Sequence, residues 1–201
     1  MSAQIHTLLF DLGGVVVDYR GPERLAALSN GRLSLAEAHE ALSITPALHE
    51  FERGELSPLA FAEHAVTGWG LDVTPGDFIA DFETWPERFL PGARETIEAL
   101  GGQYRLACFS NINIPHWRQA EALGVAPLFD HALLSHEIGA RKPETHAYEK
   151  VIAALGGDAS GIVFFDDIEA NAAAARRAGM QAYVVTPNEG VRGALESAGV
   201  A

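Results

Sequence analysis

Four short apolar runs in the chain end on, or lead into, polar residues that could do chemistry. Asp11 follows the first run, and the pair Ser110 and Asn111 follows the second. Lys142 comes a few residues after the third, and the pair Asp166 and Asp167 follows the fourth. A carboxylate can attack phosphorus or carbon and can bind Mg²⁺, whereas a hydroxyl, an amide and an ammonium suit phosphate oxygens.

These runs are the elements that must position the polar residues. They cover residues 7–10, 105–109, 131–134 and 162–165. Apolar runs of four or five residues bounded by turn signals are typical of strands buried on both faces. In an open parallel α/β sheet, ligands bind beyond the carboxyl ends of the strands. We therefore expect the polar residues to converge on one site.

Beyond residue 90, helix and strand patterns alternate, with glycines closing most of the helices. The predicted strands cover residues 104–109, 132–135, 162–165 and 181–185. The predicted helices cover residues 93–100, 115–123, 144–155, 169–178 and 190–198. This order predicts an α/β fold with a doubly wound, Rossmann-like parallel sheet covered by helices on both faces.

Residues 18–89 show a different pattern, with helices and no strand between them. The predicted helices cover residues 22–28, 34–42, 57–69 and 75–82. We interpret this stretch as an all-helical cap inserted after the first strand, over the ends of the strands. The predicted core then consists of residues 1–17 plus 90–201. The alternative is that these helices simply extend the core.

Each polar motif also has an ordinary structural interpretation. An Asp before Gly13 and Gly14 is often turn chemistry, and Ser-Asn after a strand often caps a helix. A single loop lysine is usually solvated. Asp166 and Asp167 are the sharpest signal, because two adjacent acids after a buried strand repel each other unless a cation such as Mg²⁺ binds them. Their alternative role is to cap the following helix.

The composition limits the classes of function. The chain has 201 residues, 48% of them hydrophobic, and a formal net charge of -13. This acidity argues against nucleic-acid or anionic-membrane partners, and no apolar stretch approaches the roughly 18 residues of a membrane span. With no signal-peptide pattern at the N-terminus and one cysteine, Cys108, in an apolar run, we expect a cytoplasmic protein without disulfides.

Taken together, the four motifs resemble the haloacid dehalogenase superfamily of aspartate-nucleophile hydrolases. Residues 10–15, the pair Ser110 and Asn111, residues 141–143 and residues 165–171 look like its first to fourth motifs, in order. The fourth motif and residues 51–55 look most like sugar-phosphate phosphatases that act on glucose 1-phosphate. The fourth motif is also similar to the N-terminal phosphatase domain of soluble epoxide hydrolases.

The resemblance implies a nucleophile and a metal site. Asp11 would be the catalytic nucleophile that becomes an aspartyl phosphate. The Asp11 carboxylate, the Gly13 carbonyl and Asp167 would hold Mg²⁺, with Asp166 binding it directly or through water.

It also implies how the phosphate is held. Ser110 and Asn111 would bind the transferring phosphoryl group, and Lys142 would neutralise charge on Asp11 and the phosphate. Arg53, in the predicted cap, would bind a substrate hydroxyl or phosphate, with a solvated helix end or an interdomain ion pair as its alternative role.

Gly13 departs from the pattern of most of these phosphatases, which carry a second aspartate at this position as general acid and base. Such a group typically contributes about 10²–10⁴-fold in rate. We therefore expect substrates with good leaving groups, such as anomeric sugar phosphates, acyl phosphates or aryl phosphates. A substitute acid or base could come from the polar cluster of the predicted cap, which contains His49, Glu52, Arg53 and Glu55.

Three functions follow as hypotheses. The first is a Mg²⁺-dependent phosphatase acting on a small phosphorylated metabolite, such as glucose 1-phosphate. The second is a 2-haloacid dehalogenase, which also lacks the second aspartate but has neutral residues where this chain has Asp166 and Asp167. The third is a non-catalytic binding protein with the same fold. The predicted partner is a small phosphorylated molecule, and the sequence leaves the oligomeric state open.

Overall fold

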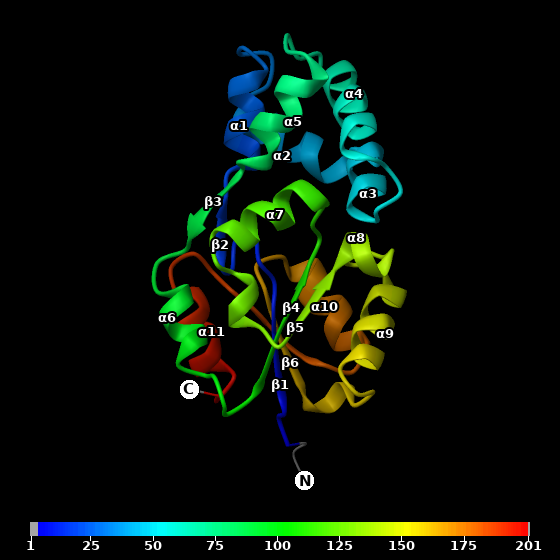
Figure 1. Cartoon of the computed structure of the whole chain (residues 1–201). Coiled ribbons are helices and arrows are strands. Elements are labelled where there is room, and N and C mark those ends of the chain that lie inside the picture. Colours follow the sequence, from blue (N-terminus) through cyan, green and yellow to red (C-terminus); the bar gives the residue numbers. More distant parts are fainter. Residues whose placement is uncertain (1–3, 201) are drawn as a thin grey trace.

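The computed structural model describes residues 4–200, with a five-stranded parallel sheet at its centre, ordered β5-β4-β1-β6-β7 (Figure 1). The strands are β1 (Thr7–Phe10), β4 (Arg105–Ser110), β5 (His131–Leu134), β6 (Ile162–Asp166) and β7 (Gln181–Val184). Each predicted strand is present within a residue or two. The ends of the predicted core, residues 1–3 and 201, lie outside the described residues.

The sheet separates two hydrophobic clusters, because successive residues of a buried strand point to opposite faces. Leu8 and Phe10 belong to one cluster, and Leu9 belongs to the other. The first face is covered by α6 (Ala93–Glu98), α7 (Ile114–Ala122) and α11 (Gly190–Ser197), and the second by α9 (Thr145–Ala154) and α10 (Glu169–Arg177). The predicted doubly wound α/β fold is therefore confirmed.

Five consecutive helices, residues 21–83, pack above the sheet, and we call them the helical unit (Figure 1). They are α1 (Gly21–Leu28), α2 (Leu35–Ile44), α3 (Pro46–Glu52), α4 (Pro58–Gly68) and α5 (Pro75–Glu83). Helix α2 begins with a capping box between Ser34 and Glu37. The unit has its own hydrophobic cluster, rich in aromatic side chains that include Phe51 and Phe61, with ring centroids 4.6 Å apart.

The prediction that residues 18–89 are all-helical is wrong at both ends of the stretch. Strands β2 (Val17–Tyr19) and β3 (Pro86–Phe89) pair in antiparallel fashion and connect the helical unit to the core. Across the pair, Arg88 donates to Asp18 at 2.7 Å. Strands this short do not show an alternating pattern in the sequence. Their pairing is also hidden, because the two strands lie about seventy residues apart in the chain.

Two short helices were also missed by the sequence patterns. The first is α3, which carries Glu52 toward the core. Its start at Thr45 and Pro46 repeats the cap-and-proline signal seen at Ser57 and Pro58, so this helix was detectable. The second is α8 (Ser135–Ile138), a single turn after β5 that ends at Gly139. The described residues also contain two 3-10 turns, Ala126–Leu128 and Ala159–Gly161.

The helical unit contacts the core mainly through α5 and α7. His116 on α7 is buried, and its ring stacks on Phe82 of α5 with centroids 4.0 Å apart. Its Nε2–H donates to the Phe82 carbonyl at 2.9 Å, and its Nδ1 accepts from Asn113 at 3.2 Å. The imidazole is thereby fixed as the neutral tautomer.

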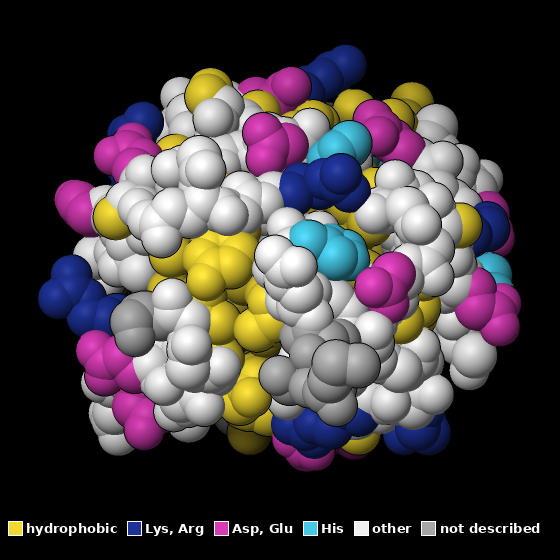
Figure 2. Space-filling model, turned by 90° about the horizontal axis from the view of Figure 1, so that it is seen from below, with side chains coloured by type: hydrophobic (Ala, Val, Ile, Leu, Met, Phe, Trp, Pro, Cys, Tyr) yellow, Lys and Arg dark blue, Asp and Glu magenta, His cyan; other side chains and the backbone are white. Residues whose placement is uncertain are grey.

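The opposite end of the molecule carries the amino ends of the strands. Figure 2 views this end and shows apolar side chains gathered in a band, with charged side chains toward the rim. Cys108 lies buried in β4, and burial raises the pKa of its thiol to about 12, as expected for an unreactive cysteine. Within residues 4–200, no helix is both long and apolar enough to cross a membrane.

The neutral His116 makes stability depend on pH. Burial lowers the pKa of His116 from 6.5 to about 3. Between these values the unfolded chain binds a proton that the folded chain does not. The free energy of unfolding therefore falls as the pH decreases through this window, by up to about 1.4 kcal/mol per pH unit.

The difference in the free energy of unfolding between wild type and His116→Gln, measured by urea unfolding, should shrink from pH 7 to pH 4. The exposed His64→Gln variant is the control, and a His116→Gln difference constant across this range would contradict the prediction.

Candidate active site

The loop after β1 is tightly folded around Asp11. The Asp11 N–H donates to the Phe165 carbonyl of β6 at 2.8 Å, and the Leu12 N–H donates to Asp11 Oδ1 at 2.7 Å. Gly14 has a φ of 75°, and a Cβ there would overlap the carboxylate of Asp167. A glycine is thus needed for the two carboxylate-bearing loops to approach each other.

Lys142 links the ends of β1 and β6. Its Nζ lies 2.9 Å from Asp11 Oδ1 and 2.6 Å from Asp166 Oδ2, and its side chain is only 1% exposed. Burial lowers the pKa of the ammonium, but the two carboxylates outweigh burial, so this pKa lies above its usual value. Lys142 is therefore a permanent positive charge inside the protein, in contrast to a solvated loop lysine.

Asn111 fixes the backbone of Lys142. The Asn111 Nδ2 donates to the Lys142 carbonyl at 2.9 Å, and the Lys142 N–H donates to Asn111 Oδ1 at 2.7 Å. Both polar ends of the Asn111 amide are engaged in this way, so the side chain positions Lys142. The second Nδ2–H and the backbone N–H of Asn111 are the donors left for its predicted contact with phosphate.

Asp166 is completely buried and fully hydrogen-bonded. Its Oδ1 accepts from the Ile168 N–H at 2.8 Å and from Asn171 at 3.0 Å, and its Oδ2 accepts from Lys142 and, at 3.2 Å, from Asn171. The sequence assigned no role to Asn171. The available signal was its position, five residues after Asp166 and in the first turn of α10.

Three carboxylates gather at this point. Oxygens of Asp11, Asp166 and Asp167 lie within 4.8 Å of one another. When all three are ionised, they face the one ammonium of Lys142 with an excess of two negative charges. Burial raises the pKa of Asp11 to about 7 although Lys142 opposes it, and burial and Asp166 raise the pKa of Asp167 to about 6. The charge excess and the all-oxygen donor set fit a hard divalent cation.

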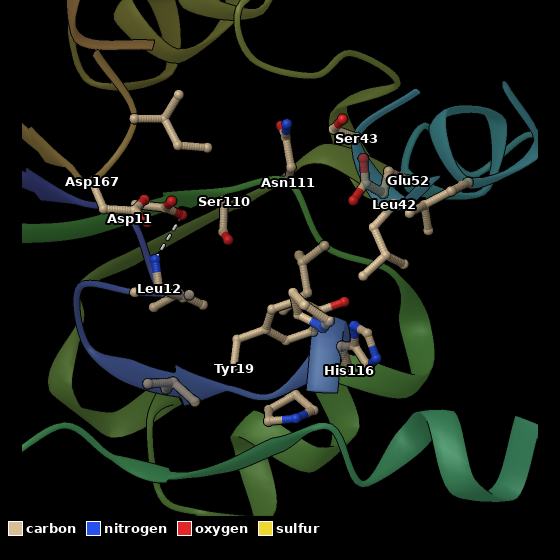
Figure 3. A pocket seen from close by; sticks show the side chains of 18 of the residues that line it. Asp11, Leu12, Tyr19, Leu42, Ser43, Glu52, Ser110, Asn111, His116 and Asp167 are labelled. Atoms are coloured by element: carbon tan, nitrogen blue, oxygen red, sulfur yellow. Dashed lines mark hydrogen bonds between the residues drawn. The ribbon is translucent and has the colours of Figure 1, made fainter. Parts of the chain in front are cut away.

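A cavity of about 830 Å³ opens from this cluster toward the helical unit. Figure 3 shows Asp11, Asp167 and Ser110 at one side, and Leu42 and Glu52 of the helical unit at the other. Gly13 and Lys142 also line the cavity. Six of the eight predicted site residues line the cavity, namely Asp11, Gly13, Ser110, Asn111, Lys142 and Asp167. A seventh, Asp166, is buried beside them against Lys142.

Of the four polar residues predicted as a source of acid or base, Glu52 lines the cavity. Its Oε2 accepts from Arg141 at 3.0 Å, and its pKa is raised by burial although Arg141 opposes it. Arg53 lies outside the lining, where it binds Glu55 at 2.8 Å and approaches Glu144 at 3.6 Å. The location of Arg53 therefore favours its alternative role as an ion pair between the helical unit and the core.

The cavity lining also contains residues that sequence patterns did not identify. Tyr19, Leu42 and Ile112 are examples, and they come from β2, α2 and the loop after β4. Each is an ordinary apolar or aromatic residue in its local segment. Their common location depends on how the helical unit packs against the core, which local periodicity does not encode.

Comparison with protein families decides the relationship. The model of the haloacid dehalogenase-like (HAD-like) hydrolases matches residues 5–179. The chain belongs to this family. The resemblance recognised from the four motifs is therefore confirmed at the level of the superfamily, and the protein is a HAD-like hydrolase.

Individual relatives match shorter stretches of this HAD-like hydrolase. Phosphatase MT3486 of Mycobacterium tuberculosis is 47% identical over 58 residues, which is 29% of this chain and 27% of that protein. A ribulose-1,5-bisphosphate 5-phosphatase of Halopiger xanaduensis is 31% identical over 124 residues, which is 57% of this chain and 52% of that protein. The chain thus spans about a quarter and about half of the lengths of these two relatives.

A solved structure resembles the whole chain. A HAD family enzyme from Bacteroides thetaiotaomicron, in complex with magnesium and inorganic phosphate, has a TM-score of 0.78 at 23% identity. The superposition covers 94% of this chain and 98% of that one. At this identity the likeness shows that the two proteins share a fold.

Replacing the buried ammonium tests the charge balance of the site. In Lys142→Met, the two buried carboxylates of Asp11 and Asp166 lose their partner, and we expect the free energy of unfolding to fall by about 3–5 kcal/mol at pH 8 without divalent cations. The loss should be smaller at pH 5, because protonation removes the repulsion. Urea unfolding measures both values. Lys150→Met is the control, because Lys150 is exposed and bonds only the Ile138 carbonyl. A loss equal to that of the control would contradict the prediction.

Proposed function

We propose that the protein is a Mg²⁺-dependent phosphatase that forms an aspartyl-phosphate intermediate on a small phosphorylated metabolite. The observation that carries this proposal is the Asp11 carboxylate, held 2.9 Å from the buried Lys142 ammonium at the end of the cavity. The phosphatase relatives and the magnesium and phosphate bound by the similar enzyme support it.

In the proposed reaction, Asp11 is the nucleophile. A carboxylate oxygen of Asp11 forms a bond to phosphorus while the bond from phosphorus to the leaving oxygen breaks, and the leaving alcohol takes up a proton. Water then attacks the aspartyl phosphate, which releases inorganic phosphate and restores the carboxylate. Lys142 stabilises the charge on the phosphoryl oxygens, and Ser110, which is 4% exposed at the cavity wall, donates its hydroxyl to them.

Mg²⁺ would be held by the carboxylates of Asp11 and Asp167 and by the Gly13 carbonyl. Bound there, the cation supplies positive charge to the phosphoryl oxygens. Asp166 was predicted as a further ligand, directly or through water. Because both of its oxygens accept hydrogen bonds from Lys142, Asn171 and Ile168, we propose that it mainly orients Lys142.

The substrate class follows from Gly13, which provides no acid or base. We propose a phosphate monoester whose leaving group needs little protonation. A sugar phosphate such as glucose 1-phosphate stays the prediction of the sequence resemblance. Dehalogenase chemistry and a binding role without turnover are the outcomes that the following assay would distinguish.

The first assay is hydrolysis of para-nitrophenyl phosphate and glucose 1-phosphate, with Mg²⁺ or with EDTA, by wild type and by Asp11→Asn. We expect turnover that EDTA abolishes and that falls at least about 10³-fold in Asp11→Asn, because the amide is not a nucleophile. Asp130→Asn is a suitable control, since its carboxylate accepts from the Leu106 N–H away from the site. Halide release from a 2-haloacid without phosphatase activity would contradict the proposal.

Gly13→Asp tests the missing acid directly. A Cβ at this position would lie 3.6 Å from the Tyr19 Cβ, an ordinary contact, so the first atom of a side chain fits there. We expect this variant to raise kcat for an alkyl phosphate about 10-fold or more and to change para-nitrophenyl phosphate hydrolysis much less, because only the poor leaving group needs protonation. Equal changes for the two substrates would argue against this account of Gly13.

A further inference from the structure

Away from Asp11, the cavity is walled by apolar side chains from both the core and the helical unit. Leu42 and Leu48 come from α2 and α3, and Ile112 comes from the loop after β4. Tyr19 lines the same cavity, near His116 (Figure 3). Its ring is packed so closely on Gly21 that a Cβ there would overlap it, and it meets the His116 ring edge-on at 5.5 Å. The ring is therefore a fixed aromatic surface.

Large apolar side chains also surround the open parts of the cavity. Leu35 of α2 is 54% exposed and Ile168, next to Asp167, is 52% exposed, and both line the cavity. Exposed apolar side chains that gather at a concave site, in contrast to single ones scattered over the surface, indicate a binding surface.

Some polar side chains in this part of the cavity already have partners, whereas the Tyr19 hydroxyl and the His39 ring bond no other described side chain or backbone group. The Ser43 hydroxyl donates to the Glu40 carbonyl at 2.7 Å, and Asn113 bonds both the ring and the backbone of His116. A sugar ring placed here would find the Tyr19 hydroxyl and the His39 ring in a largely apolar wall. Most of its hydroxyl groups would therefore lose water without gaining a new partner, and its desolvation would be unfavourable.

The charged groups of the lining are also committed. Arg141 pairs with Glu52 at 3.0 Å, and Glu23 lies 3.5 Å from Arg20. His116 is held neutral by its tautomer and burial. Among the described lining residues, Lys142 and Arg141 are the permanent cations, and Lys142 faces Asp11. A second phosphate on the leaving group would therefore meet no unpaired lysine or arginine in the lining.

The size of the cavity exceeds what the reacting phosphate needs. Ligand sites of drug-sized molecules typically measure about 300–1,000 Å³, and the 830 Å³ here lies in the upper part of that range. The remaining volume is available to the leaving group.

We propose that this apolar part of the cavity, formed around Tyr19, Leu42, Leu48 and Ile112, binds the leaving group. The substrate is then a phosphate monoester of an apolar aryl alcohol, whose leaving group needs little protonation and carries no second anionic group. This inference rests on the proposed phosphatase function, because it assumes that the phosphoryl group lies at Asp11. It favours an apolar leaving group over the hydroxyl-rich one of glucose 1-phosphate.

The test measures binding, independently of turnover. Isothermal titration of the Mg²⁺-loaded protein with methyl-, butyl- and hexylphosphonate, which are not hydrolysed, reports the contribution of each methylene. We expect the dissociation constant to fall by roughly fourfold per methylene, from the free energy of burying a CH₂ group. Hydroxypropylphosphonate, which replaces the terminal methyl of the butyl compound by a hydroxyl, should bind about tenfold more weakly than butylphosphonate.

Variants test which side chains cause the gain in affinity per methylene. Leu42→Ser should reduce the gain per methylene while leaving the affinity for inorganic phosphate within about twofold. Ile44→Ser is the matched control, because Ile44 lies on the same helix, is 63% exposed and does not belong to the cavity lining. Leu35→Ser is a second test that removes an exposed side chain and so does not depend on the stability of the helical unit.

Two results overturn the inference, and they are distinguishable from failure of the function. Equal affinities for methyl- and hexylphosphonate, with inorganic phosphate still bound, would show that the leaving group does not enter the apolar part. Tighter binding of the hydroxylated compound than of butylphosphonate would show the same. If neither inorganic phosphate nor any phosphonate binds, the phosphatase proposal itself is wrong, and the inference falls with it.

Discussion

The ammonium of Lys142, buried between the carboxylates of Asp11 and Asp166, is the interaction on which the site depends. A buried charge is tolerated only when it is paired and hydrogen-bonded, and each of these three groups would be costly without the others. The pairing therefore fixes the loop after α8 against the ends of β1 and β6. Asn111 and Asn171 complete the arrangement, since one holds the lysine backbone and the other holds the Asp166 carboxylate.

This lysine does not balance the site by itself. Asp167 adds a third carboxylate, and the excess of two negative charges gives the site its affinity for a divalent cation and, through it, for phosphate oxygens. The core thus supplies the groups that would act on the phosphoryl group. The helical unit supplies a different environment, largely apolar toward the cavity, with the ion pair between Glu52 and Arg141 at its boundary with the core. In the proposed function, the core therefore supplies the phosphoryl chemistry, and the helical unit contributes apolar contacts to the leaving group.

Much of the core was predictable because its signals are local. A strand buried on both faces must be apolar throughout, and its carboxyl end is marked where polar residues begin, so Asp11, Ser110 and Asp167 could be placed from the sequence. The departures have equally physical causes. The hairpin of β2 and β3 forms between segments far apart in the chain, and Arg53 is directed away from the cavity by its ion pairs with Glu55 and Glu144.

The sequence by itself determined the doubly wound sheet, the family and the residues of the phosphate end, because strand burial, helix caps and four ordered motifs are properties of short segments. Only the tertiary structure decided that Asn111 positions Lys142, that Asp166 is consumed by hydrogen bonds, and that Tyr19, Leu42 and Ile112 share one wall. These outcomes depend on which side chains of distant segments compete for the same partner or fill the same space, and local patterns carry no information about that competition.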